Sequence, residues 1–202
     1  PEVVSLGRRL GADRFLVTNV LPYTEDMAGE ILYADTLNTA AIAAPSPLAP
    51  WLHFCRMDLH EGTVTPLYRV IKGWRVANYE RDVSVTDHNY CPFVESGSLA
   101  IAWDGSVSPC VPLMHNHDSF LNDRRRSSER FVVGNINDQK LSLLWGNPEY
   151  VAFRELVKAF DFSPCTHCGG CRLSHANQED CLGNLFPTCG GCLWAQGVIR
   201  CP

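Results

Sequence analysis

The sequence lacks the features of a membrane-bound or secreted protein. No apolar run approaches the roughly 18 residues that a membrane-spanning helix needs. The first residues, Pro1 to Val4, contain neither the basic segment nor the apolar segment of a signal peptide. We therefore expect a cytoplasmic protein that has no membrane partner.

An excess of basic residues is also missing. The 202 residues include 17 Lys and Arg against 22 Asp and Glu, which gives a net charge of -5 at pH 7. A protein that neutralises backbone phosphates needs a basic face, so we expect no nucleic-acid partner. With 46% hydrophobic and 19% charged residues, the chain has an ordinary globular composition, and its length suits one large or two small domains.

Cysteine is the residue type that stands out. Ten cysteines occur, and seven of them lie between Cys165 and Cys201. Disulfide scaffolds distribute their cysteines to connect loops, whereas a dense C-x2-C cluster in a chain without a secretion signal indicates metal ligation. Cys55 lies apart in an apolar stretch, and we expect it to be a small buried hydrophobic residue.

The start of the chain is typical of α/β structure. Apolar residues at helical spacing stop at Gly11, and Arg14 to Leu21 then predicts a buried strand that ends at Pro22. Such a strand needs parallel neighbours on both sides, so we expect upstream sequence or a second chain to complete its sheet. The alternative is a small complete α/β domain with an edge strand. We also predict a connection over residues 40–50, a strand over 51–59 and a helix over 63–72.

A β-hairpin is predicted in the second half of the chain. Two short strands, over residues 98–103 and 106–108, flank Asp104-Gly105, which is the strongest short-range hairpin signal. Cys91 and Cys110 lie on either side of this hairpin.

A loop and a helix follow. Residues 122–130, with three consecutive arginines, show no apolar periodicity and predict a solvated loop, with a docking role for the arginines as the alternative. Asn147 and Pro148 predict an N-cap and the first turn of a helix. The apolar face of that helix would consist of Val151, Phe153, Leu156, Val157 and Phe160.

The C-terminal cysteines follow the spacing C-x2-C-x2-C-x9-C-x7-C-x2-C-x8-C. They are Cys165, Cys168, Cys171, Cys181, Cys189, Cys192 and Cys201. A C-x2-C step lets two thiolates approach one metal site, and the paired glycines within each Cys-Gly-Gly-Cys free the backbone to wrap around it. With Cys91 and Cys110 these cysteines number nine. Two sites of four thiolates each would use eight of them and leave one over. Two zinc ions and two [4Fe-4S] clusters satisfy this count equally well.

The arrangement Cys91-x13-Gly105-x4-Cys110, followed by the C-terminal cysteines, resembles the SPASM extension of radical S-adenosylmethionine (SAM) enzymes. The family pattern is C-x(9-15)-G-x4-C, gap, C-x2-C-x5-C-x3-C, gap, C. The first half matches fully, whereas the second departs through the C-x2-C step at Cys189 and through the added Cys171 and Cys181. A still closer resemblance is to the maturases associated with tungsten-containing aldehyde oxidoreductases. It is carried by NYCPFV at 89–94, WDGSVSPC at 103–110, GNI at 134–136 and DC at 180–181 with PTCGGCLWA at 187–195.

This resemblance implies a fold and a division of the chain. Residues 1–88 would be the C-terminal strand and helices of a radical SAM partial (β/α) barrel plus a connecting segment. Residues 89–202 would be a small, loop-rich α+β SPASM module with a β-hairpin and iron-sulfur clusters. Asn19 and Leu21, at the end of the barrel strand, would border the adenosyl group of SAM, with plain core packing as the alternative.

The resemblance also implies two auxiliary [4Fe-4S] clusters. The first would use Cys91, Cys110 and Cys192, and the second would use Cys189, Cys201 and two of Cys165, Cys168 and Cys171. The family's additional upstream ligand to the first cluster has no cysteine counterpart before Cys91, so Cys171 or Cys181 is expected to substitute.

The predicted function is the auxiliary-cluster part of a radical SAM maturase that modifies a protein, a peptide or a tungsten oxidoreductase cofactor. The motif C-x3-C-x2-C, which leaves one iron open for SAM, does not occur. We therefore expect SAM to act only with the missing barrel half, from upstream sequence or a partner. A ferredoxin or flavodoxin donor and a protein or cofactor substrate are further expected partners. The alternatives are a peptide or sulfatase maturase, an electron carrier and a zinc-stapled interaction module.

One further residue beside the cysteines has a predicted role. Asp180 precedes Cys181, and its residue type favours a turn or a helix cap. A proton carrier near a cluster is the alternative.

Overall fold

The computed structural model describes residues 2–12, 15–34, 52–54, 57–58, 60–63, 89–121, 124–166 and 171–199. The chain forms two compact units. One takes in Pro1–Val20, Ile31–His88 and Gly197–Pro202, and the other takes in Leu21–Glu30 and Asn89–Gln196. The predicted connection over 40–50, most of the predicted helix over 63–72 and Cys55 lie outside the described residues.

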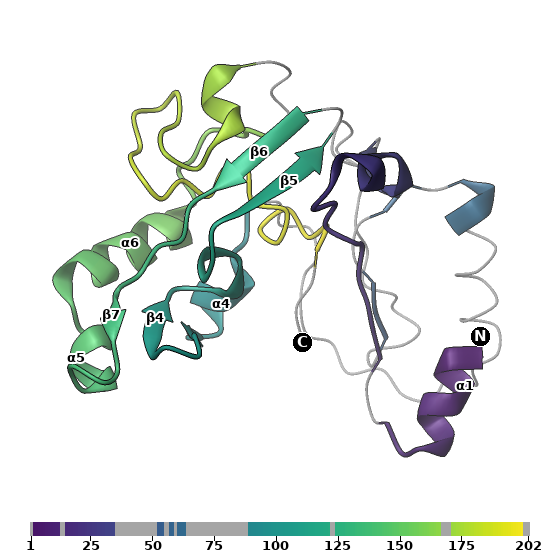
Figure 1. The fold of residues 1–202 in the computed structure, drawn as a ribbon, viewed down its shortest axis with the longest axis horizontal. Helices are drawn as coiled ribbons and strands as arrows, with labels where there is room; N and C mark the ends of the chain where they lie inside the picture. Colours follow the sequence, from purple (N-terminus) through teal and green to yellow (C-terminus); the bar gives the residue numbers. More distant parts are fainter. Residues whose placement is uncertain are drawn as a thin grey trace. The chain divides into compact units, whose positions relative to one another are not determined.

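The first unit contains a helix and a parallel strand pair (Figure 1). Helix α1 (Glu2–Arg9) is followed by Gly11 at a φ of 82°, which confirms the predicted helix end. Strand β1 (Phe15–Val17) pairs in parallel with β2 (Leu52–Phe54), as the α/β prediction requires. However, β1 ends before the predicted Leu21. Asn19 bonds through its side chain, which donates to the carbonyl of Val198 at 2.8 Å.

The second unit is built around a small antiparallel sheet and several short helices (Figure 1). Its first elements are the 3-10 helix η1 (Glu25–Glu30) and helix α4 (Pro92–Glu95). The sheet has the order β3-β4-β7, with β3 at Ala100–Ile101, β4 at Ser106–Ser108 and β7 at Gly134–Asn135.

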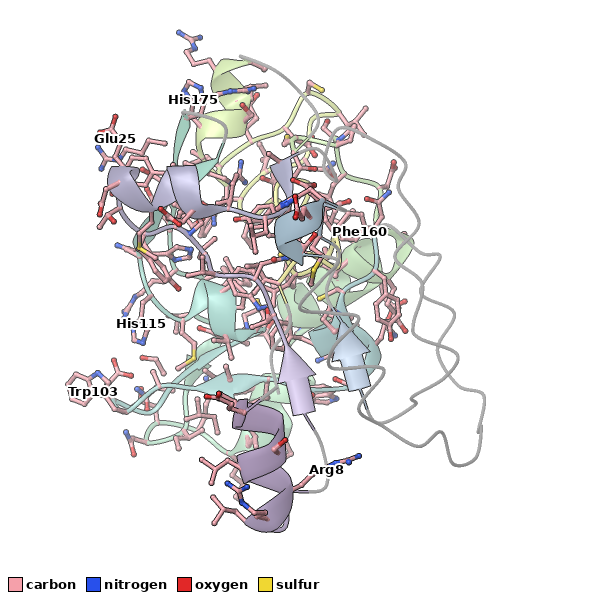
Figure 2. The ribbon with its side chains drawn as sticks, turned by 90° about the vertical axis from the view of Figure 1, so that its right-hand side faces the viewer. Arg8, Glu25, Trp103, His115, Phe160 and His175 are labelled. Carbon is pink, nitrogen blue, oxygen red and sulfur yellow. The ribbon has the colours of Figure 1, made fainter. Side chains whose placement is uncertain are left out.

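The hairpin β3–β4 confirms the prediction from Asp104-Gly105. Ala100 lies opposite Ser108, and Gly105 closes the turn at a φ of 82°, a conformation that favours glycine. The Asp104 carboxylate accepts a hydrogen bond from the N–H of Ser106 at 2.9 Å. Trp103 lies at the tip of the turn, where it projects away from the ribbon and is 93% exposed (Figure 2).

A second hairpin replaces the predicted loop over residues 122–130. Strand β5 (His117–Leu121) pairs antiparallel with β6 (Arg124–Ser128). Along β6 exposed residues alternate with partly buried ones, and Asp118 on β5 accepts hydrogen bonds from the exposed Arg125 and Ser127, each at 2.6 Å. The loop prediction is wrong. The exposed and partly buried positions of β6 alternate as in a strand, but none of them is apolar, so the sequence shows no hydrophobic pattern. The carboxylate that binds Arg125 lies on the neighbouring strand.

The second unit also contains two longer α-helices. They are α5 (Leu141–Trp145) and α6 (Pro148–Ala159). Asn147 caps α6, since its side-chain oxygen accepts from the N–H groups of Glu149 and Tyr150, which confirms the predicted helix start. The buried face contains Tyr150 and Phe153, whereas Val151, predicted to be buried, is 36% exposed.

The hydrophobic core of this unit lies between the helices and the loops that carry cysteine. Its buried residues are Val94, Leu113, Tyr150, Phe153, Val157, Phe160, Phe162 and Ala195. Four partly buried cysteines, Cys91, Cys110, Cys189 and Cys192, pack against it. The core therefore forms one side of the candidate site.

Candidate metal centre

Two of the predicted ligands each precede a short helical turn. Cys91 lies immediately before α4, and Cys110 lies immediately before the 3-10 helix η2 (Val111–Leu113). Burial raises the pKa of the Cys91 thiol, while hydrogen bonds from the backbone N–H groups of Val94 and Phe93 lower it. The start of α4 thus supplies donors that stabilise a thiolate at Cys91.

Two further predicted ligands, Cys189 and Cys192, lie at the ends of a tight turn that contains Gly190 and Gly191. The N–H of Cys192 donates to the carbonyl of Cys189 at 2.9 Å. A Cβ atom on Gly190 would overlap the carbonyl oxygen of Ser163, and one on Gly191 would overlap a neighbouring guanidinium. Glycine is therefore required at position 190, where the overlap is with backbone, whereas a side chain at position 191 would displace the end of a flexible arginine side chain.

These two pairs of cysteines, Cys91 with Cys110 and Cys189 with Cys192, line one cavity of about 70 Å³. Burial raises the pKa of Cys189 well above its usual range, and the nearby Cys192, Cys110 and Cys91 raise it further. Burial also raises the pKa of Cys192 to about 11. Thiols in this setting ionise together only if positive charge is supplied, and a bound metal centre supplies it.

The spacing of these thiols bears on the kind of metal centre. Within the described part of the chain, no three Cys, His, Asp or Glu side chains are placed to hold one metal ion. A zinc site draws its sulfur ligands to about 2.3 Å from a single ion. In a [4Fe-4S] cluster each thiolate binds a different iron, so the four ligands surround a larger object. The four-cysteine cavity presents these four thiols as candidate ligands of a metal centre.

The remaining walls of the cavity are mostly apolar. Leu113, Phe153 and Val157 contribute core side chains, and Arg126 is a charged residue of the lining. Apolar walls keep water from the metal centre and strengthen the electrostatic effect of any charge near it.

The other predicted ligands lie in the adjoining loops. Cys165 is partly buried in a turn, and its N–H donates to the carbonyl of Ser163 at 2.7 Å. Cys171 is partly buried and precedes the 3-10 helix η3 (Arg172–His175). Cys181 is exposed, does not line the four-cysteine cavity, and has its Sγ 2.9 Å from the hydroxyl of Ser163. Cys168 and Cys201 lie outside the described residues.

The two residues predicted to border SAM are both buried. Asn19 belongs to the first unit, where its side chain bonds to Val198. Leu21 belongs to the second unit, where it lines the four-cysteine cavity. Their predicted contact with SAM stays a prediction.

Asp180 is a buried carboxylate that closes the turn after η3. One of its oxygens accepts from the N–H groups of Leu182 and Asn184, and the other accepts from the N–H of Ser163, all at 3.0 Å. Burial raises the pKa of Asp180, but these bonds and one from the Asn184 side chain outweigh burial and leave the pKa lowered. The predicted turn role is confirmed.

Arg126 is the residue of the site that sequence reasoning missed. It lines the four-cysteine cavity and a smaller cavity beside Cys165, and its Nη1 donates to the carbonyl of Ser174. Burial lowers the pKa of its guanidinium, whereas Cys165, Cys192 and Cys189 raise it. The only signal in the sequence was the run of three arginines, because on a strand Arg124 and Arg126 lie on the face opposite to Arg125.

Comparison with known proteins identifies relatives of the chain. Residues 91–172 match the SPASM iron-sulfur cluster-binding domain. The chain is 27% identical, over its whole length, to the tungsten-containing aldehyde ferredoxin oxidoreductase cofactor-modifying protein of Pyrococcus furiosus, and it spans about half (51%) of that protein. No solved structure matches the chain. The resemblance stated from the sequence is thereby confirmed.

None of the helices in the described part of the chain is both long and apolar enough to cross a bilayer.

Proposed function

We propose, from the confirmed SPASM resemblance, that the chain is the auxiliary-cluster part of a radical SAM maturase. Its substrate in this proposal is a tungsten-containing oxidoreductase or the cofactor of that enzyme. Support comes from the Pyrococcus relative, whose name describes a cofactor-modifying protein. The chain spans 51% of that relative, so the other half is expected to carry the part that binds and cleaves SAM.

The observation that carries the proposal is the cavity lined by Cys91, Cys110, Cys189 and Cys192. We assign these four thiolates to the first [4Fe-4S] cluster. The sequence resemblance assigned Cys189 to the second cluster, but its place on this cavity supports the first. The second cluster would then use Cys165, Cys168, Cys171 and Cys201, and the exposed Cys181 would be the spare cysteine.

The protein's own contribution is to hold and shield the clusters. A bound [4Fe-4S] cluster supplies one-electron transfer or a coordination site for a substrate. The N–H groups of Phe93 and Val94 lie beside Cys91, and those of Trp194 and Ala195 lie beside Cys192. These donors stabilise the ligand sulfurs, and the core side chains exclude water.

The first unit fits the proposal as the end of the partial barrel. Its parallel pair β1–β2 is the kind of structure that such a barrel contains. In the complete enzyme the remaining barrel, in upstream sequence or a partner, would bind SAM, and a cytoplasmic ferredoxin or flavodoxin would supply electrons.

The proposal is tested by metal and sulfide analysis of the anaerobically purified chain, with the paramagnetic resonance spectrum of the dithionite-reduced sample. Two four-iron clusters give about eight irons and eight sulfides per chain. The double variant C91A/C110A should lose about four of each and one of the two reduced-cluster signals. About two zinc ions without sulfide would overturn the proposal and indicate a zinc-stapled module.

A further inference from the structure

We propose that Arg126 raises the reduction potential of the cluster in the four-cysteine cavity by holding a positive charge against its thiolates. This inference deepens the proposed function and rests on it. It gives a role to Arg126, which is not one of the predicted cysteine ligands.

The position of Arg126 is fixed by the second hairpin. On β6 it pairs with Ser119 of β5 and is partly buried, whereas its neighbour Arg125 is exposed. The guanidinium lies against the Cys189–Cys192 turn so closely that a Cβ on Gly191 would overlap it. Its Nη1 donates a hydrogen bond to the carbonyl of Ser174, and the residue lines one cavity with Cys189 and Cys192 and another with Cys165.

The charge of Arg126 has no carboxylate partner among the described residues. The ion pairs found there join Arg125 to Asp118 and Lys158 to Glu155. A buried cation is costly unless negative charge lies nearby. Arg126 lines one cavity with Cys189 and Cys192 and a second cavity with Cys165. As ligands of a bound cluster, these cysteines would be the thiolates that supply the negative charge.

The sign of the effect follows from the charge of the cluster. With four thiolates, an oxidised [4Fe-4S] cluster carries two negative charges in all, and one electron from an external reductant adds a third. No bond forms or breaks, and no proton is needed. A fixed cation stabilises the more negative reduced form, so removing it lowers the midpoint potential.

The inference is tested by redox titration, followed by paramagnetic resonance, of the cluster-loaded chain and its R126M, R126K and R125M variants. The signal that disappears in C91A/C110A identifies the relevant cluster. We expect R126M to lower the equilibrium constant for one-electron reduction at least about tenfold, which is about 59 mV. R126K keeps the charge and should shift the potential by less than half as much. R125M removes an equal charge from an exposed position on the same strand and should leave the potential unchanged.

The outcomes separate this inference from the proposed function. If R126M keeps about eight irons with an unchanged midpoint potential, the inference is overturned and the proposed function stands. A shift in R126K equal to that in R126M, or loss of iron in both variants, would also overturn it, because it would show a packing role. Loss of iron in R126M alone would also overturn it, because it would show that the charge holds the cluster in place rather than setting its potential. Zinc without sulfide in the unaltered chain would overturn both.

Discussion

The Cα of Gly190 lies so close to Ser163 that a methyl group on it would occupy the place of the Ser163 carbonyl oxygen. This contact joins the Cys189–Cys192 turn to the loop before Cys165. The same carbonyl accepts the N–H of Cys165 at 2.7 Å. One peptide group of Ser163 therefore fixes the distance between the two cysteine loops.

Gly190→Ala should separate these loops. Because the overlap is with backbone, the chain must shift, and we expect a loss of roughly 1–3 kcal/mol in the free energy of unfolding together with reduced cluster content. Thermal unfolding and iron analysis measure both. Gly29→Ala is the matched control, since nothing lies within 4 Å of a Cβ there. Equal iron in both variants would show that the turn tolerates the shift.

Cys189→Ala and Cys181→Ala should differ in iron content. Cys189 lines the four-cysteine cavity, whereas Cys181 is exposed. The first variant should lose about four irons and the same signal that C91A/C110A loses, and the second should keep about eight. If Cys189→Ala instead removes the other signal, Cys189 is a ligand of the second cluster, as the resemblance predicted. Iron loss in Cys181→Ala would show that Cys181 is a cluster ligand and not the spare cysteine.

Asp180→Asn should destabilise the chain in a pH-dependent way. The charged carboxylate accepts four hydrogen bonds in a buried position, so its replacement should cost about 2–3 kcal/mol at neutral pH. Because its pKa is lowered in the folded state, this stability is present above the ordinary carboxyl pKa of about 4 and is lost as the pH falls through the folded value. Denaturant unfolding of both proteins from pH 7 to pH 3 should show the difference narrowing. A constant difference would mean that charge is not involved.

Asn147→Ala should weaken the start of α6. The Asn147 side chain accepts from two N–H groups in the first turn, and the loss of such a cap costs about 1 kcal/mol. Asn147→Asp keeps an acceptor in the same place and is the matched control. Urea unfolding should show a lower midpoint for the alanine variant alone, and equal midpoints for the two variants would contradict the capping role.

Features that depend on neighbouring residues could be predicted from the sequence. Asp104-Gly105 indicated the hairpin, and Asn147-Pro148 indicated the start of α6, because both signals act within one turn of chain. The predicted apolar face of α6 was also largely correct, since Phe153, Val157 and Phe160 are buried. It wrongly included Val151, which is 36% exposed, and it left out the buried Tyr150.

Features that depend on distant contacts could not be predicted. The polar strand β6 pairs with β5, where Asp118 accepts hydrogen bonds from Arg125 and Ser127, and nothing in the residues of β6 indicates burial on one side. Cysteine spacing placed Cys189 in the C-terminal group but could not show that its turn meets Cys91 and Cys110 across the core. The role of Arg126 depends on both of these contacts and could not be inferred without them.

The second unit draws its residues from two distant stretches of the chain. Leu21–Glu30 belongs with Asn89–Gln196, and the N–H of Phe120 on β5 donates to the carbonyl of Pro22 at 2.8 Å. Residues 21–30 leave the ribosome well before residues 89–196, so the second unit can fold only after the later stretch has been made. Expression of the later stretch alone would leave the edge of β5 without that acceptor and open to pairing with other chains. A clone intended to isolate the cysteine-rich part should therefore keep residues 21–30.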